Sequence, residues 1–368
     1  MENLPFDIDY ICREFSIPGR FTGYKTKSDG IINKTYVISF DNCGKEEKYT
    51  LQNINTYVFK NPYELMKNIS AVTSHIHNAI IQKGLDPQRR VLSFLAASDG
   101  NCCCKDENAN FWRLYHYIDG VYTLNTIDKP SVFEACGRAF GEFQNLLSDF
   151  DGQSLYETIE NFHNTKIRLE QLKDALKTDA VGKAKDIQAE IEFIISRESD
   201  CKKLAELTDA GLLPIRVTHN DTKLNNVLFD NETDEGICII DLDTVMPGLS
   251  LYDFGDSVRF GANKVIEDEP DTSKVGIDLN LYESYTKGYL SSCADKLNDL
   301  EKDLLPFSVK VLALELGIRF LTDYLNGDLY FKITHPMHNL ERCRNQLALS
   351  RDIEINMDKM KEITQKYI

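Results

Sequence analysis

The 368-residue chain lacks any apolar run near the ~20 residues that a membrane-spanning helix requires. Residues 1–7 are acidic and lack the apolar core of a secretory signal peptide. Basic residues are few for the acidic content, with 42 Lys and Arg against 58 Asp and Glu and a formal net charge of −16. Nucleic acids and anionic membranes both select basic surfaces. We therefore expect a cytoplasmic chain that binds no nucleic acid and no membrane, and no obligate protein partner is evident.

The cysteines also lack a recognisable framework. There are ten of them, and without an export signal we expect reduced thiols rather than disulfides. Cys102, Cys103 and Cys104 are consecutive in a polar stretch and have no C-x-x-C partner pair. A surface turn is the preferred interpretation, and a zinc site is the alternative.

The first third of the chain is rich in strand-forming residues. Segments 30–40 and 47–52 predict a β-hairpin around the turn at 41–44, and 91–95 and 111–118 predict two further strands. Pro62 predicts the start of a helix between these strands. No repeat or low-complexity linker interrupts the chain.

The rest of the chain is mostly helical in pattern. Pro130 predicts a helix with an apolar face, and a charged stretch at 157–207 predicts two solvated helices with a break near 178–182. The length exceeds that of one typical domain. We therefore predict an α+β fold with two lobes: a small antiparallel-sheet lobe at 1–118, which binds nucleotide, and a larger, mostly helical catalytic lobe at 119–368.

A polar loop at 219–226 contains Asp221 and Asn226 and lies between apolar segments. A second apolar segment then ends at Asp241 and Asp243. Alternate residues of a strand face the same side, so we expect both of these carboxylates to face one volume. Oxygen donors of this kind suit phosphoryl transfer, in which one carboxylate accepts the proton of the attacking hydroxyl and others hold Mg²⁺ at the phosphates. The alternative is that these side chains only cap turns.

The loop sequence H-N-D-T-K-L-N-N at 219–226 resembles the kinase catalytic loop H-R-D-x-x-x-x-N. Asn in place of Arg, together with the I-D-x-D strand end, is typical of the aminoglycoside phosphotransferase/choline kinase superfamily. This resemblance implies a protein-kinase-like fold. Asp253-Phe254-Gly255 spells D-F-G, but we expect Asp241 to occupy the metal-binding position and Asp253 to cap backbone N–H groups or brace the catalytic loop.

Segments 218–223, 240–248, 252–256 and 319–328 resemble more narrowly the N-acetylhexosamine 1-kinases. The resemblance implies Asp221 as the base at the sugar 1-hydroxyl and Lys223 as a cation at the γ-phosphate. It implies that Asn226 and Asp241 are metal ligands. Asp243 would be a ligand of a second metal or a supporting residue. It implies as sugar-contacting residues Asp221, Phe260, Arg319 and Tyr330. For Arg319 the alternative is a buried structural ion pair, and for Phe260 and Tyr330 it is packing in the core.

The nucleotide side departs from the general kinase pattern. Gly30 stands alone where a glycine-rich loop would be, and Gln52 occupies the strand position of the phosphate-binding lysine. The group that replaces that lysine stays unassigned. The candidate phosphate contacts are Gly30, Asn33, Thr35 and Lys48, and the adenine is expected against the strand that contains Tyr115 and Tyr117, with Asp119 near the ribose.

The sequence therefore predicts an ATP- and Mg²⁺-dependent kinase that phosphorylates N-acetylglucosamine or N-acetylgalactosamine at the 1-hydroxyl. The first alternative is the same chemistry on another acceptor, such as choline, an aminoglycoside or another hexose. The second is a nucleotide-binding pseudokinase that serves as a scaffold. The intact set of Asp221, Asn226 and Asp241 argues against the scaffold.

Overall fold

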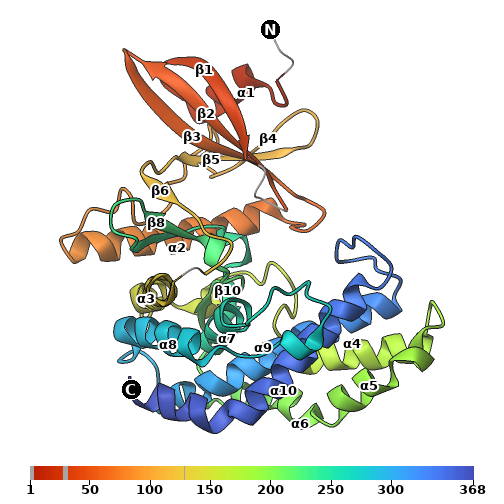
Figure 1. Cartoon of the computed structure of the whole chain (residues 1–368). Helices are drawn as coiled ribbons and strands as arrows, with labels where there is room; N and C mark the ends of the chain where they lie inside the picture. Colours follow the sequence, from red (N-terminus) through yellow and green to blue (C-terminus); the bar gives the residue numbers. More distant parts are fainter. Residues whose placement is uncertain (1–3, 28–31, 128) are drawn as a thin grey trace.

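The computed structural model describes residues 4–27, 32–127 and 129–368. Its small lobe consists of a five-stranded antiparallel sheet and two helices, and it lies above the helical lobe in Figure 1. The strand order is β1-β2-β3-β5-β4. The elements are α1 (Ile8–Phe15), β1 (Arg20–Lys27), β2 (Lys34–Asn42), β3 (Lys45–Ile54), α2 (Pro62–Gln82), β4 (Cys104–Lys105) and β5 (Phe111–His116).

The helix α2 connects the small lobe to the rest of the molecule. The Asn61 side chain caps it by accepting from the N–H of Glu64, and Pro62 stands in its first turn. Apolar side chains at helical spacing, Leu65, Ile69 and Val72 among them, are fully buried. The Asn68 amide donates to the carbonyl of Val245, which belongs to the large lobe, at 3.1 Å. The helix is thus fixed to both lobes.

The large lobe is mainly helical, with short strands near the small lobe (Figure 1). Its helices are α3 (Pro130–Leu146), α4 (Thr165–Thr178), α5 (Gln188–Ile195), α6 (Glu198–Asp209), α7 (Ser250–Gly261), α8 (Leu279–Cys293), α9 (Asp299–Leu325) and α10 (His338–Gln365). Its strands are β6 (Val121–Tyr122), β7 (Arg216–Thr218), β8 (Val227–Asp230), β9 (Gly236–Ile239) and β10 (Met246–Gly248). β7 pairs with β10, and β8 lies between β6 and β9. No helix among the residues described here is long and apolar enough to cross a membrane.

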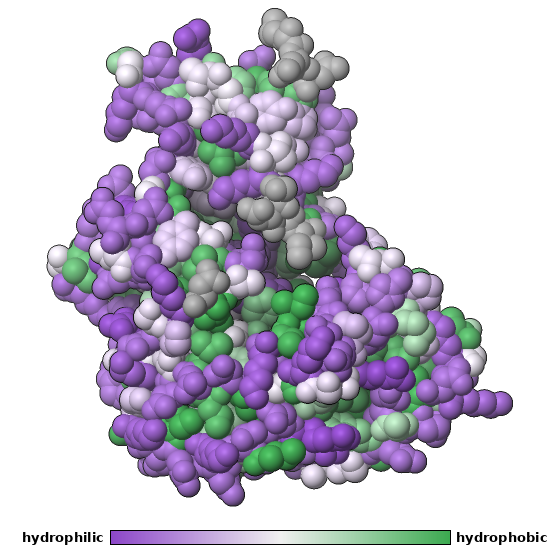
Figure 2. Space-filling view, in the orientation of Figure 1, coloured by the Kyte–Doolittle hydropathy of each residue, from purple (hydrophilic) through white to green (hydrophobic). Residues whose placement is uncertain are grey.

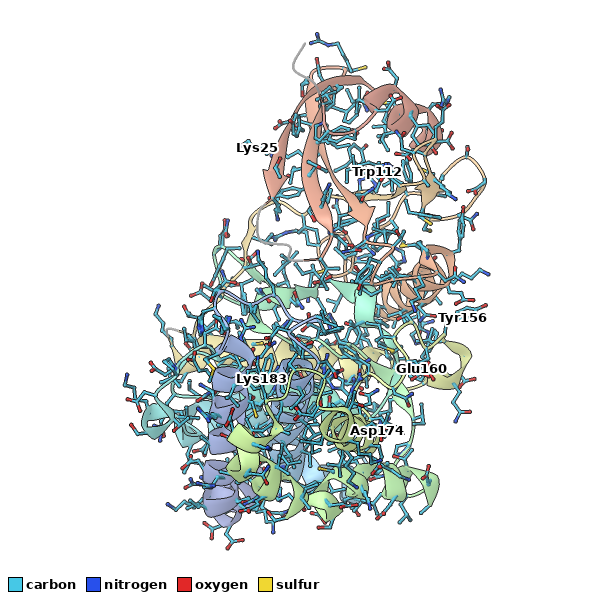
Figure 3. The ribbon with its side chains drawn as sticks, turned by 90° about the vertical axis from the view of Figure 1, so that its right-hand side faces the viewer. Lys25, Trp112, Tyr156, Glu160, Asp174 and Lys183 are labelled. Atoms are coloured by element: carbon cyan, nitrogen blue, oxygen red, sulfur yellow. The ribbon has the colours of Figure 1, made fainter. Side chains whose placement is uncertain are left out.

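These elements confirm the predicted fold class, with an antiparallel small lobe and a helical large lobe. The predicted lobe boundary at 118/119 falls between β5 and β6 and stays a prediction. Trp112 is buried beside Phe6 and packs inside the small lobe (Figure 3).

Three local predictions were wrong. Segment 91–95 forms one isolated bridge, Phe94 to Tyr115, rather than a strand. The charged stretch at 157–207 contains three helices instead of two solvated ones, because Leu169 and Leu172 of α4 pack into a shared core with α9. Cys103 and Cys104 are buried instead of lying in a surface turn, and Cys104 begins β4. All ten cysteines are free, as predicted.

Candidate active site

The predicted catalytic loop follows β7, and Asp253 of α7 holds its backbone. The Asp253 carboxylate accepts the backbone N–H of His219 at 2.9 Å and that of Asn220 at 2.8 Å. The Gln144 amide donates to the same carboxylate at 3.0 Å. Asp253 is fully buried, so its hydrogen bonds are shielded from water and fix the loop strongly. The prediction that Asp253 braces the loop is confirmed.

Two further residues tie the loop to the segment that follows β9. Nε2 of His219 lies 2.9 Å from the carbonyl oxygen of Ile240, the residue before Asp241. The Asn220 amide donates to the carbonyl of Thr244 at 2.9 Å. Asn220 has a φ of 63°, which is uncommon for a residue other than glycine and is maintained by the surrounding contacts. His219 therefore orders the loop through its ring as well as its backbone.

Asp221, Lys223 and Asn226 lie together in this loop. Nζ of Lys223 is 2.7 Å from the Asp221 carboxylate, and the Asn226 amide donates to the Asp221 carbonyl at 2.8 Å. Burial opposes the charge on Lys223, but the carboxylate of Asp221 outweighs it and raises the pKa of the lysine. A hydroxyl placed at Asp221 would therefore meet a carboxylate that accepts a proton and an adjacent cation that stabilises negative charge.

Asp241 lies two residues beyond the end of β9 and has a φ of 59°. Its side chain is accessible to solvent, and none of its oxygens accepts a hydrogen bond from the described residues. Desolvation by the surrounding protein, followed by repulsion from Asp243 and Asp221, raises the pKa of this carboxyl to about 6. A carboxylate that is crowded by other carboxylates and lacks donors fits a divalent cation, and the amide oxygen of Asn226 is a suitable second ligand. Asn226 and Asp241 are therefore the residues that would hold Mg²⁺.

Asp243 lies in a short 3₁₀ turn, Leu242–Thr244, and not on the strand. The expectation that it alternates with Asp241 on one strand was wrong, because β9 ends at Ile239 and Asp241 adopts a left-handed conformation. One Asp243 oxygen accepts from Arg113 and the other from the Asn33 amide. With both oxygens engaged, Asp243 suits a supporting role better than direct coordination.

The small lobe contributes a row of polar side chains that the sequence did not indicate. Thr35, Gln52 and Arg113 are direct cross-strand neighbours on β2, β3 and β5. Gln52 donates to the Thr35 hydroxyl at 3.0 Å and accepts from Nε of Arg113 at 2.9 Å. Only the register between β3 and β5 brings Gln52 and Arg113 together. Gly30 lies outside the described residues.

The two tyrosines predicted to line the adenine site have different surroundings. Tyr115 packs against Phe94, with ring centroids 5.0 Å apart, and burial raises the pKa of its hydroxyl. Tyr117 is half-buried, and the ammonium groups of Lys27 and Lys48 lie 5.5 and 6.0 Å from its ring. Lys48 also forms a 3.1 Å ion pair with Asp119. Tyr117 and Asp119 lie close to the junction between the lobes, and their contact with a nucleotide stays a prediction.

Arg319 of α9 lies among the rings of Phe162, Tyr330 and Phe331, and we call this group the predicted acceptor side. Its guanidinium is 5.1, 5.9 and 5.6 Å from the rings of Phe162, Tyr330 and Phe331. Tyr330 is 67% exposed, and Asp323 holds its segment by accepting its backbone N–H at 2.8 Å. Packing in the core therefore does not explain Tyr330, and Arg319 forms no salt bridge with the described residues. Phe260 is half-buried near the end of α7 and stacks on none of the described aromatic rings.

Arg168 of α4 is a further cation on this side that the sequence did not single out. Burial, and then the neighbouring Arg319 guanidinium, lower its pKa. Its Nε is buried and has no partner among the described residues, while Nη2 donates to the Phe162 carbonyl at 2.9 Å. Two guanidinium groups, neither in a salt bridge within the described part of the chain, therefore flank Phe162.

The acceptor side is connected to the catalytic loop through buried contacts. Glu315, one helical turn before Arg319, lies 2.9 Å from Nδ1 of His163. Nε2 of the same ring lies 3.0 Å from the carbonyl oxygen of Asn220, the residue before Asp221. Arg319 and Asp221 are thus held relative to each other by α9, His163 and the loop. Figure 2 shows that the surface is hollowed between the two lobes.

The family model for the phosphotransferase enzyme family matches residues 31–279, which include the catalytic loop and Asp241. The chain belongs to this family. The phosphotransferase also resembles solved structures along nearly its whole length. An aminopropanol kinase associated with a microcompartment has a TM-score of 0.57 at 15% identity, covering 96% of this chain and 99% of that one.

Two further solved structures have the same fold. A spectinomycin phosphotransferase, in complex with ADP and spectinomycin, has a TM-score of 0.59 at 13% identity, covering 95% of this phosphotransferase and 99% of that chain. A choline kinase from Cryptosporidium parvum Iowa II has a TM-score of 0.57 at 14% identity, covering 96% of both chains. The predicted protein-kinase-like fold is therefore confirmed.

Proposed function

We propose that this phosphotransferase transfers the γ-phosphoryl group of ATP to the anomeric hydroxyl of N-acetylglucosamine or N-acetylgalactosamine. The observation that supports it most is the catalytic loop, which buried contacts to Asp253 fix and in which Asp221, Lys223 and Asn226 lie together near Asp241. Asp221 takes the proton of the sugar 1-hydroxyl as that oxygen attacks in line. Lys223 stabilises charge on the transferring phosphoryl group.

Asn226 and Asp241 would hold Mg²⁺, which when bound neutralises charge on the β- and γ-phosphates. The protein holds these oxygen ligands rigidly, because the backbone N–H of Ile240 donates to the backbone carbonyl of Asn226 at 2.9 Å. That bond fixes the distance between the loop and the Asp241 segment. Positioning and electrostatics then account for most of the expected rate enhancement.

The acceptor side favours a neutral sugar over a cationic substrate. Choline, aminopropanol and aminoglycosides carry positive charge, and a site for them requires carboxylates or unoccupied aromatic faces. Here Arg319 covers the rings of Phe162, Tyr330 and Phe331, and Arg168 lies next to it. Guanidinium groups can donate hydrogen bonds to sugar hydroxyls and to an N-acetyl carbonyl, and an aromatic ring can pack against the apolar face of a sugar.

The test is ADP release from Mg-ATP with purified protein and a panel of N-acetylglucosamine, N-acetylgalactosamine, glucose, galactose, choline and spectinomycin. We expect turnover with the N-acetylhexosamines, loss of activity with EDTA, and a phosphate on the anomeric carbon by NMR. Arg319→Met should raise the sugar KM while the ATP KM changes little. Turnover of choline or spectinomycin instead would refute an N-acetylhexosamine as the acceptor. The absence of ADP release with every acceptor would favour the alternative of a pseudokinase scaffold.

A further inference from the structure

The small lobe lacks the strand lysine that kinases place on the nucleotide phosphates, and Gln52 stands in its position. A neutral amide cannot supply the missing positive charge. The nucleotide nevertheless needs cationic contacts on this side, because a triphosphate has several negative charges and the large lobe presents three carboxylates, Asp221, Asp241 and Asp243. Another residue of the small lobe must then provide the cation.

Arg113 is the cation nearest to these carboxylates from the small lobe. It is 2% exposed, its Nη1 donates to Asp243, and its charge also acts on Asp241. It is placed from the neighbouring strand β5, directly opposite Gln52. Lys48, the other candidate, forms an ion pair with Asp119, just beyond the predicted lobe boundary.

The surroundings of Arg113 fix its orientation. Nε donates to the Gln52 amide oxygen, and Gln52 in turn donates to the Thr35 hydroxyl, so that the amide cannot turn over without losing both bonds. In protein kinases a helix glutamate pairs with the strand lysine. Here the corresponding helix α2 places the sulfur of Met66 3.8 Å from Nη1, so no helix carboxylate neutralises the arginine. Nη2 has no hydrogen-bond acceptor among the described residues.

We propose that Arg113 takes over the phosphate-binding role of the absent lysine, and that Gln52 positions it. This rests on the proposed use of ATP but not on the identity of the acceptor. A guanidinium has five N–H donors in a planar fork, so Arg113 can keep its bonds to Gln52 and Asp243 and direct the remaining donors at a phosphate oxygen. The buried ion pair with Asp243 holds the cation in place before the nucleotide arrives.

The test measures the affinity for Mg-ATP, Mg-ADP and adenosine by calorimetry, without any acceptor. Arg113→Gln should weaken Mg-ATP roughly 10- to 100-fold, the usual worth of one hydrogen bond to a charged group, and leave adenosine within about threefold. The double variant Arg113→Gln/Gln52→Lys places a cation on β3 again and should recover at least tenfold of that loss. Equal weakening of Mg-ATP and adenosine would overturn the proposal.

The same substitution in an Asp243→Asn background distinguishes a structural role of Arg113 from phosphate binding. There no buried carboxylate is left unpaired, so the protein without Arg113 should fold. We expect Arg113→Gln to weaken Mg-ATP by a similar factor in that background. No additional loss would mean that Arg113 acts only through Asp243. A wild-type protein that binds Mg-ATP but phosphorylates no sugar would refute the proposed acceptor and leave this result intact.

Discussion

The catalytic loop of the large lobe and the polar row of the small lobe are built in different ways. The loop places Asp221, Lys223 and Asn226 within six residues. Asp253, which lies 33 and 34 residues from Asn220 and His219, holds the backbone of the loop. The row joins Thr35, Gln52 and Arg113 across three strands, at positions up to 78 residues apart. Each side chain in the row depends on strand register, whereas the loop residues are adjacent in sequence and their backbone is held by buried contacts such as those to Asp253.

This difference explains why the sequence predicted the catalytic loop but not the polar row of the small lobe. A contiguous motif has the same spacing in every chain that folds it, because the backbone geometry of a loop is local. A cationic side chain on a neighbouring strand can occupy the same place beside a ligand. The sequence then shows only that the usual lysine is missing. The missing lysine at position 52 and the arginine at position 113 become related only when β3 and β5 are paired.

The largest effect should come from the loop. Asp221→Asn removes the proton acceptor and should lower kcat by about 10²–10⁴, with little change in affinity for Mg-ATP. Steady-state kinetics with the best acceptor and calorimetry with Mg-ATP measure the two quantities. Glu232→Gln, a comparable change at an exposed position in the β8–β9 turn, is the matched control and should keep wild-type activity. A fully active Asp221→Asn variant would refute the catalytic assignment.

The sequence was sufficient for the fold class and for the elements with strong local signals. α2 and α3 begin at the prolines that predicted them, and the β8–β9 hairpin lies where the apolar segments indicated. It failed where packing decides the structure. The α4 face with Leu169 and Leu172 resembled a solvated helix because its apolar partners lie in α9, about 150 residues away. The position of Asp243 also depends on tertiary contacts, since Arg113 and Asn33 determine which way its carboxylate points.

A smaller effect on Mg-ATP affinity should come from the polar row, in which Thr35 orients Gln52 and Gln52 orients Arg113. Thr35→Val keeps the shape of the side chain but leaves the Gln52 amide without its acceptor. Gln52 then orients Arg113 less strictly, and we expect Mg-ATP affinity to fall by roughly threefold to tenfold, with adenosine and the acceptor KM unchanged. The variant should have no effect in the Arg113→Gln protein, because the residue through which it acts is absent. Additive losses in the two variants would show that Thr35 acts independently of Arg113.

The smallest effect concerns the pH dependence of the loop support. Both ring nitrogens of His163 face acceptors, the Glu315 carboxylate and the Asn220 carbonyl, and Asp256 adds a more distant negative charge. Burial disfavours the charged ring, but Glu315 outweighs it and raises the pKa of His163, while His163 helps to lower the pKa of Glu315 against the opposing effect of burial.

The sign of the pH effect follows from these directions. His163 contributes stability that is complete below its ordinary pKa of 6.5 and is lost as pH rises through the raised value, and Glu315 contributes stability that is lost only in acid. The midpoint of thermal unfolding should therefore fall from pH 6 to pH 9 more steeply in the wild type than in His163→Gln. His75→Gln, which removes an exposed pair with Asp149, should keep the wild-type slope. Equal slopes in the wild type and His163→Gln would mean that the protonation of this buried pair does not change on folding.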